Sequence, residues 1–445
     1  MKYNILLSLF LLFALRAVEA QQMDLNQCIR YALDNNLAIT NKNLEESLNN
    51  ELYMQTKRNF LPQIYGGSSA NKQYGRSIDP TTNSFVNHDF FSMNFYVDTQ
   101  LELFRGFSRI NSMKFQKLNL LIGLEESKQK KMEIAFEVMN HYYDLLYFTR
   151  LHEIVQEQLR LTILNTEKIK TMIGLGLKSE SDLLEMKAQQ ATETHNLLLA
   201  ENQYDLAAIS LKSLMNWPLS KELNPVDESM ENTIAIQPSA DRVYEAALLH
   251  MPSVWKAELD VEAAGKQLAI AKGNLAPTLT LGGGIYTNFA DSRKEESHNG
   301  LAEQTIPFME QWSQNLAQSV YLNLQIPIFN RWYGNSQLKQ AKWRKTMAEN
   351  RQEEEQQKLY RLVNEDVQQL NSLQKELDLL ETKKEATQEA FLIAEKKLDQ
   401  GLISIIEFYT AKNQLAQAET EWIRTLLQLK IKEKTIRIYL GEELF

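Results

Sequence analysis

Cysteine, proline and long apolar runs are scarce in this sequence of 445 residues. The one cysteine, Cys28, excludes a disulfide framework and any zinc site built on paired cysteines. Acidic residues outnumber basic ones by 57 to 48, and the net charge of -9 argues against a broad surface for nucleic acid. Hydrophobic residues make up 44% of the chain, and the mean hydropathy is -0.39. Composition alone therefore indicates a soluble, acidic, globular protein.

The first twenty residues depart from that composition. Lys2 precedes an apolar run from Ile5 to Leu15, and small residues at Val18 and Ala20 form a cleavage site. The run is too short for a membrane-spanning helix. This layout predicts that residues 1–20 are a secretory signal peptide and that the protein is exported.

The rest of the chain repeats itself. Residues 25–67 align with 240–282, and residues 95–189 align with 320–414 without a gap. A constant register over that length indicates an internal duplication. The sequence therefore predicts two structural repeats, 21–216 and 240–445, joined by a proline-bearing linker at 217–239.

Each repeat predicts the same order of elements: a helix, a β-hairpin, a very long helix and a return helix. Prolines are absent from 81–217 and 328–445. Apolar residues in the long helices recur at a spacing near 3.5, which is typical of coiled-coil packing. A continuous helix from Asn335 to Gln400 is about 100 Å long, so it needs helical partners along its length. The expected ranges are hairpins 62–104 and 277–329, long helices 107–173 and 335–398, and return helices 180–214 and 405–440.

The hairpin strands alternate between apolar and polar residues. Val97 and Leu101 alternate with Asp98 and Gln100, and Val320 begins a similar pattern that extends to residue 328. Strands of about ten residues with one lipid face and one water face suit a membrane β-barrel, although a soluble sheet explains a single hairpin equally well. Four strands cannot close a barrel, and open sheet edges are not tolerated in lipid. Membrane insertion therefore requires several chains, and three chains supply twelve strands.

This ordered set of features resembles the TolC family of outer-membrane factors over essentially the whole exported chain. The residues that carry the resemblance are Ala32, Leu33 and Asn36, the Leu61-Pro62 pair before a strand, the G-L-x-S-x-x-D turn at 176–182 and the G-x-x-S-x-x-E copy at 401–407. The resemblance implies a mainly α fold with a β membrane part. Four β-strands of each chain contribute to a trimeric 12-stranded barrel, and long coiled-coil-like helices form a periplasmic tunnel.

The resemblance also implies a function. A homotrimer in outer-membrane lipid serves as the passive exit duct of a tripartite efflux or type I secretion system, together with a periplasmic adaptor and an inner-membrane pump, and without a cofactor. In that picture 75–90 and 290–316 are external loops, 217–239 lies in an equatorial collar, and the turns 174–180 and 399–405 are the periplasmic tips. The cargo, whether drug, metal or polypeptide, is not specified by these features.

The tips supply the candidate site residues. Asp182 and Glu407 are expected to line the periplasmic aperture, although a helix dipole favours acids at these positions for structural reasons alone. The family mouth carries an Arg–acid latch, whereas this chain has Ile403 and Thr410 at the corresponding positions, so no latch is identified. The glycines are expected to leave the helical conformation at tight reversals. The expected adaptor-docking residues are Gly174, Gly176, Leu177, Ser179, Gly401, Leu402 and Ser404.

Two other classes of protein compete with the duct. A periplasmic coiled-coil adaptor also contains long helical hairpins, but it has one hairpin and a lipoyl-like domain rather than a duplicated unit. An enzyme with a coiled-coil insertion needs a catalytic constellation. The six histidines are scattered, and Gly282–Gly284 lacks the following helix that a phosphate-binding loop requires. The sequence therefore predicts no catalytic residues and no metal site.

Overall fold

The computed structural model describes residues 21–78, 83–87, 89–226, 239–295 and 304–442. The expected signal peptide and most of the linker 217–239 lie outside these residues. The chain divides into two compact units. Unit 1 is formed by Met1–Glu46, Gly123–Ala257 and Gln352–Phe445, and unit 2 by Ser47–Ile122 and Glu258–Arg351.

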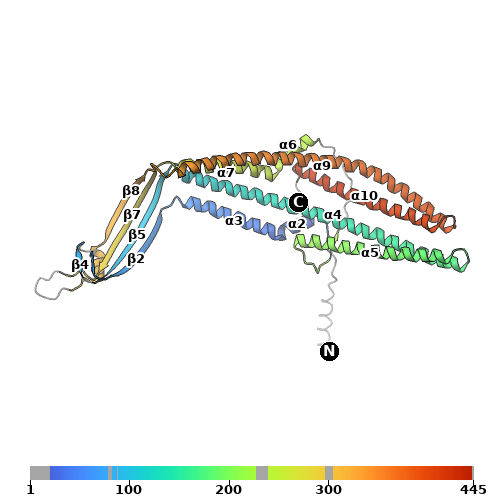
Figure 1. Ribbon diagram of the computed structural model, residues 1–445, viewed down its shortest axis with the longest axis horizontal. Coiled ribbons are helices and arrows are strands. Elements are labelled where there is room, and N and C mark those ends of the chain that lie inside the picture. Colours follow the sequence, from blue (N-terminus) through green and yellow to red (C-terminus); the bar gives the residue numbers. More distant parts are fainter. Residues whose placement is uncertain (1–20, 79–82, 88, 227–238, 296–303, 443–445) are drawn as a thin grey trace, which may run out of the picture. The chain divides into compact units, whose positions relative to one another are not determined.

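Two very long helices dominate the chain (Figure 1). Helices α4 (Ser108–Gly174) and α9 (Tyr333–Asp399) each contain 67 residues, and α4 continues without a break through Gly123. Each is followed by a return helix, α5 (Glu180–Met215) or α10 (Ile405–Tyr439). Shorter helices precede the strands: α2 (Leu25–Asn35), α3 (Leu37–Arg58), α6 (Ala240–His250) and α7 (Pro252–Gly273). Within the described ranges, none of the helices is both long and apolar enough to cross a membrane.

Unit 1 is held together by apolar side chains between helices. One cluster joins α2, α4, α5 and α10 around Leu145 and Leu211, which are fully buried. The adjacent strands β1 (Gln21–Met23) and β6 (Leu223–Pro225) pair in parallel. The Tyr142 hydroxyl ties this pair to α4, because it lies 3.1 Å from the carbonyl oxygen of Met23 and 2.7 Å from that of Val226.

Unit 2 contains an antiparallel sheet in the order β2-β5-β7-β8. Leu101, Leu281 and Leu322 lie opposite one another across three of its strands and mark an apolar face. The other face is polar, since the Tyr286 hydroxyl donates to Asp98 at 2.6 Å. The four strands are β2 (Gln63–Gln73), β5 (Phe90–Arg105), β7 (Thr278–Ala290) and β8 (Ala317–Gln325), and β3 (Arg76–Ile78), β4 (Phe85–Asn87) and helix α8 (Phe308–Gln314) lie between them in the chain.

Strand β8 ends at Gln325, although the apolar–polar alternation extends to residue 328. Pro327 explains the difference, because proline has no backbone N–H to donate to a neighbouring strand. The expected extension of this strand to residue 328 is therefore wrong.

The turn before each long helix shows the duplication in the backbone itself. Gly106 and Phe107 both adopt left-handed conformations, with φ of 54° and 62°, and the aligned residues Arg331 and Trp332 do the same, with φ of 57° and 61°. Left-handed backbone is unfavourable for residues other than glycine. Two aligned turns keep it nonetheless, so this reversal of the chain is imposed by the strand-to-helix junction and not by local preference.

Gly106 is needed for a second reason. A Cβ atom at this position would collide with the carbonyl oxygen of Gly273 and with Ala276. We expect Gly106→Ala to lower the free energy of unfolding by about 2 kcal/mol or more, because it adds this collision to the cost of a left-handed alanine. Thermal unfolding of the purified protein measures the effect.

Arg331→Ala is the matched control in the second repeat. Arg331 is exposed and already a non-glycine residue in the same conformation. Its truncation should change stability by no more than about 0.5 kcal/mol. Equal effects of the two substitutions would contradict the close-approach explanation.

Candidate functional site

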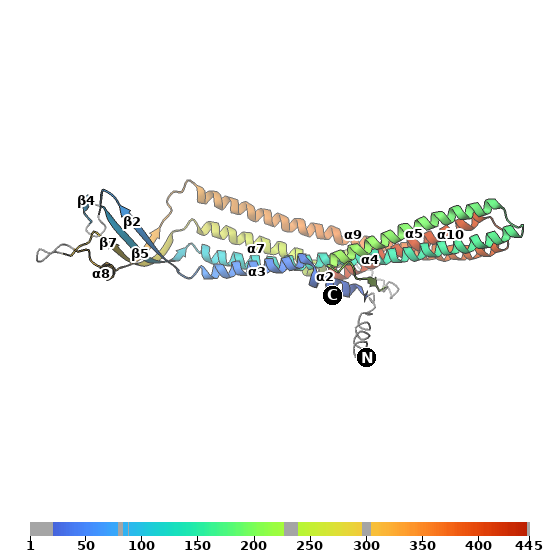
Figure 2. The ribbon, with the colours of Figure 1, turned by 90° about the horizontal axis from the view of Figure 1, so that it is seen from below.

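The two helical turns expected to form the tips lie at the same end of unit 1 (Figures 1 and 2). One joins α4 to α5 between Gly174 and Glu180, and the other joins α9 to α10 between Asp399 and Ile405. The two turns are equal in length, so the duplication extends to the tips.

Both turns end their long helix in the same way. In the first, Gly176 has a φ of 75°, its N–H donates to the carbonyl of Ile173 at 2.9 Å, and the Leu177 N–H donates to the carbonyl of Met172 at 2.9 Å. This pair of bonds is a Schellman motif, which satisfies carbonyls that the helix end would leave without donors. Gly174 is the last residue of α4 and does not have a positive φ. The expectation that Gly174 also leaves the helical conformation is wrong.

The second turn repeats the motif. Gly401 has a φ of 69°, and its N–H donates to Leu398 at 3.0 Å, while the Leu402 N–H donates to Lys397 at 2.9 Å. A glycine is suited to both central positions because it adopts positive φ without steric strain. The two tips therefore have nearly identical backbone hydrogen bonding.

The two return helices start differently. Ser179 caps α5, and its hydroxyl accepts from the N–H of Asp182 at 3.2 Å. The Asp182 carboxylate accepts in return from the N–H and the hydroxyl of Ser179, each at 2.9 Å, which completes a capping box. These bonds hold the pKa of Asp182 below its usual value. Ser404 caps α10 by accepting from the N–H of Glu407 at 3.2 Å, and the exposed Glu407 carboxylate makes no capping box.

The acids therefore lie in the first turn of each return helix. Asp182 stabilises the helix start in the way that a structural role predicts, whereas the carboxylate of Glu407 points into solvent at the same aligned position. The capping role of Asp182 is compatible with the expected place of its carboxylate at the aperture. An ionised carboxylate in a capping box still carries its negative charge.

The tips expose apolar side chains. Leu177 is 68% exposed and Leu402 is 67% exposed, and Leu175 and Ile406 beside them are also exposed. Ile403 is half-buried and packs against an apolar cluster that includes Phe391 and Phe408. Leu177 and Leu402 are therefore in solvent and take no part in the apolar cluster next to the turns.

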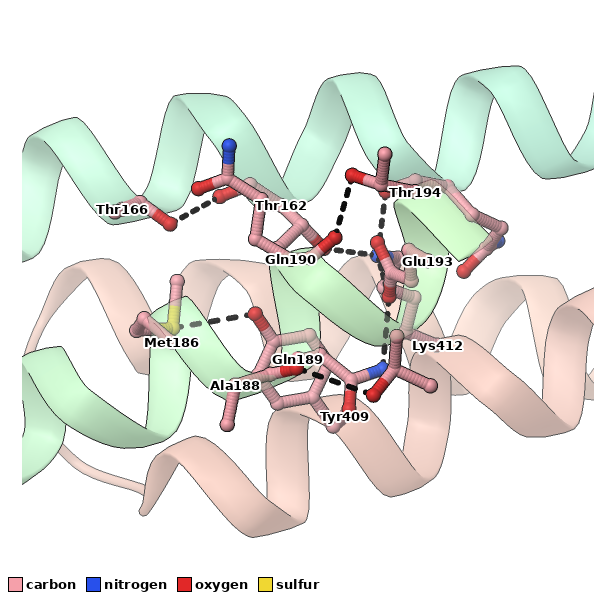
Figure 3. A network of polar contacts seen from close by, with 12 residues as sticks. Thr162, Thr166, Met186, Ala188, Gln189, Gln190, Glu193, Thr194, Tyr409 and Lys412 are labelled. Carbon is pink, nitrogen blue, oxygen red and sulfur yellow. Dashed lines mark hydrogen bonds and ion pairs between the residues drawn. The ribbon is translucent and has the colours of Figure 1, made fainter. Parts of the chain in front are cut away.

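A buried polar network lies behind the tips, and sequence reasoning missed it (Figure 3). Its centre is Lys412 of α10, whose side chain is fully buried. The three donors of its ammonium group reach the carbonyl of Gln158 at 2.6 Å, the hydroxyl of Thr162 at 2.6 Å and a carboxylate oxygen of Glu193 at 2.9 Å. Gln158 and Thr162 belong to α4 and Glu193 to α5, so one side chain joins three helices.

Glu193 is 4% exposed and is only partly satisfied. Its Oε1 atom accepts from both Lys412 and Gln189, whereas its Oε2 atom has no hydrogen-bond partner in the described part of the chain. Burial lowers the pKa of Lys412, and the hydrogen bond that Lys412 donates to Glu193 opposes that shift. Next to this pair the Tyr409 hydroxyl donates to the sulfur of Met186 at 3.2 Å.

The sequence carries a partial signal for the two charged residues, although not for their pairing. Lys412 is flanked on one helix face by Phe408 four residues before it and Leu415 three residues after it, and both are buried. Glu193 lies seven residues from both Met186 and Ala200, which are buried too. Each charged residue therefore occupies a core position of a heptad, where an apolar side chain is expected.

Neither a metal site nor a reactive cysteine is indicated by the described residues. The described residues contain no cluster of three or more histidine, cysteine or acidic side chains that could hold a metal ion. Cys28 is buried, and burial together with Asp24 raises its pKa to about 12, so its thiol is unreactive at neutral pH.

Comparison with known proteins gives the same picture of the fold. The chain is similar to the outer membrane protein VceC of Vibrio cholerae, at 17% identity and a TM-score of 0.75 over 94% of each chain. It is similar to the CmeC outer membrane channel of Campylobacter jejuni, at 13% identity and a TM-score of 0.77 over 94% of this chain and 85% of the other. The open MtrE outer membrane channel of Neisseria gonorrhoeae matches at 17% identity and a TM-score of 0.75, over 94% and 88% of the two chains.

Among curated proteins none matches the chain. The model of the outer membrane efflux protein family matches twice, over residues 28–216 and 243–442, once for each repeat. The two matches cover most of the sequence, and the matched ranges contain the four-stranded sheet, the long helices and both tips. This protein belongs to the outer membrane efflux protein family.

Proposed function

We propose that this protein is the outer-membrane exit duct of a tripartite efflux or type I secretion system. It passively conducts cargo from a pump and its adaptor across the periplasm and the outer membrane, and performs no chemistry of its own. The observation that carries the proposal is the sheet of unit 2, whose apolar face is exposed, as at Val320 and Leu322. A sheet with one bare apolar face and one polar face suits a wall between lipid and water.

A trimer accounts for the surfaces that a single chain leaves uncovered. Strands β2 and β8 are the edges of the sheet, and an unpaired edge is not tolerated in lipid. Helix α5 also exposes Leu198, Leu199 and Leu206, a larger apolar stripe than a solvated helix normally shows. Second and third copies of the chain would pair the edges and cover this stripe.

The adaptor alternative has no comparable support. An adaptor has one helical hairpin with a small lipoyl-like domain, whereas the described residues form two hairpins and a four-stranded antiparallel sheet. The family match covers both repeats and agrees with the duct.

Assembly in the outer membrane is the direct test of the proposed function. We expect outer-membrane fractions to contain a trimer that survives detergent on a gel and dissociates on heating, and we expect the purified trimer to conduct ions in planar bilayers. Recovery of the full chain as a soluble monomer would contradict the proposal.

Three copies would place three Asp182 and three Glu407 carboxylates around a common axis. An aspartate is ionised at neutral pH, and the capping bonds of Asp182 lower its pKa further. Carboxylate rings at a narrow opening favour cations over anions and provide a place for divalent cations to block the duct. We assign the periplasmic aperture to these two acids.

The charge of the rings can be removed with little change in shape. We expect Asp182→Asn combined with Glu407→Gln to lower the cation-over-anion permeability ratio and to weaken block by divalent cations in planar bilayers. The matched control is Asp399→Asn at the end of α9, whose carboxylate is paired with Lys168 at 2.9 Å. Selectivity that is unchanged in the double variant, or changed equally by the control, rules out this assignment.

The tips are the proposed docking surface for the adaptor. Gly176 and Gly401 shape the turns, Ser179 and Ser404 cap the return helices, and Leu177 and Leu402 present the exposed apolar contact. The serines are poor positions for a test, because their substitution also disturbs the helix starts. Substitution of the two leucines removes no hydrogen bond of the turns, because their side chains are exposed.

We expect Leu177→Asp combined with Leu402→Asp to abolish transport in cells, because a charge is placed where an apolar contact forms. Trimers should remain intact and should conduct in bilayers as the unchanged protein does. Leu379→Asp is the control, since Leu379 is 72% exposed on α9 away from the turns. Full transport by the tip variant would show that the adaptor binds elsewhere.

A further inference from the structure

Two helical hairpins meet in unit 1, α4 with α5 and α9 with α10. Most of their contact near the tips is apolar and includes Ile169, Met186, Phe391 and Phe408. The Lys412 network is the exception, because it places an ion pair inside this contact. Lys412 comes from the second hairpin, and all three of its acceptors come from the first.

The position of this network is costly for stability. Burying an ion pair removes hydration from both charges, and an apolar pair of similar size often stabilises a core equally well or better. Glu193 adds to the cost, since its Oε2 atom is buried without a partner. The neighbouring part of α4 also contains polar side chains, because Thr162 and Thr166 are both buried, and the Thr166 hydroxyl donates to the backbone carbonyl of Thr162 at 2.8 Å.

The buried ion pair also lowers the free-energy cost of separating the two hairpins. When two leucines separate, both are left exposed to water, whereas a separated lysine and glutamate each regain their hydration. A polar contact between the hairpins therefore narrows the free-energy difference between a closed and a separated arrangement. An apolar contact of the same area would widen it.

The network also lies close to the aperture acids. Lys412 is about 7 Å along α10 from Glu407, and Glu193 is roughly 16 Å along α5 from Asp182, at 1.5 Å per residue. Both helices are continuous over these intervals, so a small movement at the network is carried directly to the tips.

We infer that the ion pair between Lys412 and Glu193 makes the contact between the two hairpins separable. The contact keeps the tips together while the network is dry, and it releases them when water enters the network. This inference rests on the proposed function in treating the tips as the mouth of a duct. Ile403 cannot hold the mouth by hydrogen bonds, and the Thr410 hydroxyl is bonded within its own helix to Ile406 at 2.9 Å. The latch of this chain lies deeper, between the hairpins.

The separation of the hairpins can be measured without any transport assay. Spin labels on Leu177→Cys and Leu402→Cys report the distance between the two tips by pulsed electron paramagnetic resonance in the full-length trimer. Cys28 is buried, so it does not compete for the label. Each substitution below is made in this labelled background.

The single and double substitutions should act in opposite directions. Lys412→Met leaves the Glu193 carboxylate buried without its counter-charge, so the population with separated tips should rise at least about tenfold. Lys412→Met combined with Glu193→Met replaces the ion pair by an apolar pair, and the separated population should fall to the unchanged protein's level or below. A purely structural role for Lys412 predicts instead that both variants loosen the tips.

Two further variants complete the experiment. Glu193→Gln should separate the tips less than Lys412→Met, because Lys412 keeps its bonds to Gln158 and Thr162, and it serves if Lys412→Met does not assemble. Lys168→Met removes the exposed ion pair that joins the same hairpins at Asp399, and should leave the distances unchanged. Unchanged distances in both single variants, separation in the double variant, or an equal effect of Lys168→Met overturns the inference.

Bilayer conductance of the same proteins separates this inference from the proposed function. If the unchanged trimer does not conduct, the duct is contradicted while the distance measurements retain their meaning. If it conducts and neither Lys412→Met nor Glu193→Gln shifts the tips, the duct stands and the latch is wrong.

Discussion

Burial of the apolar faces of helices α4 and α9 within unit 1 is the constraint on which the rest of the structure depends. A 67-residue helix has no core of its own, and isolated helices gain little stability in water from propensity alone. Each long helix therefore packs against its return helix and against the other hairpin through heptad-like stripes. The Schellman turns at Gly176 and Gly401 are consequences of this constraint, because they reverse the chain within a few residues and bring the return helix alongside.

The two repeats are similar in backbone conformation and differ in their side chains. The left-handed pair Gly106 and Phe107 is matched by Arg331 and Trp332, so the junction geometry is kept although the residues differ. The return helices behave in the opposite way. The position aligned with Lys412 is Lys187, which is exposed, and the position aligned with Glu193 is Ala418, which is fully buried. Glu193 and Ala418 are therefore buried at the same aligned position, whereas the aligned lysine is buried only in the second repeat.

Much of the fold could be predicted because it depends on local pattern. Period-two strands, the long segments without glycine or proline and the repeated order of elements lead to the fold class and the family, and both are confirmed. Turn chemistry was also readable in part, since Gly176 and Gly401 have the positive φ that a reversal requires. Gly174 was misassigned because a glycine can end a helix in its last helical position as well as beyond it. Pro327 shortened a strand that alternation alone extends.

The buried network could not be predicted from the same patterns, and the reason is physical. A lysine within a heptad stripe is compatible with an exposed flank as well as with a buried ion pair, and only the three-dimensional neighbours distinguish them. Thr162, Gln158 and Glu193 lie far from Lys412 in the sequence, and no local signal joins them. Position 403 is an isoleucine where the resemblance implies an arginine. This difference points to the network only once the structure shows Lys412 buried between the hairpins near the tips. Apolar packing holds the hairpins together, and the polar side chains within it determine how readily they part.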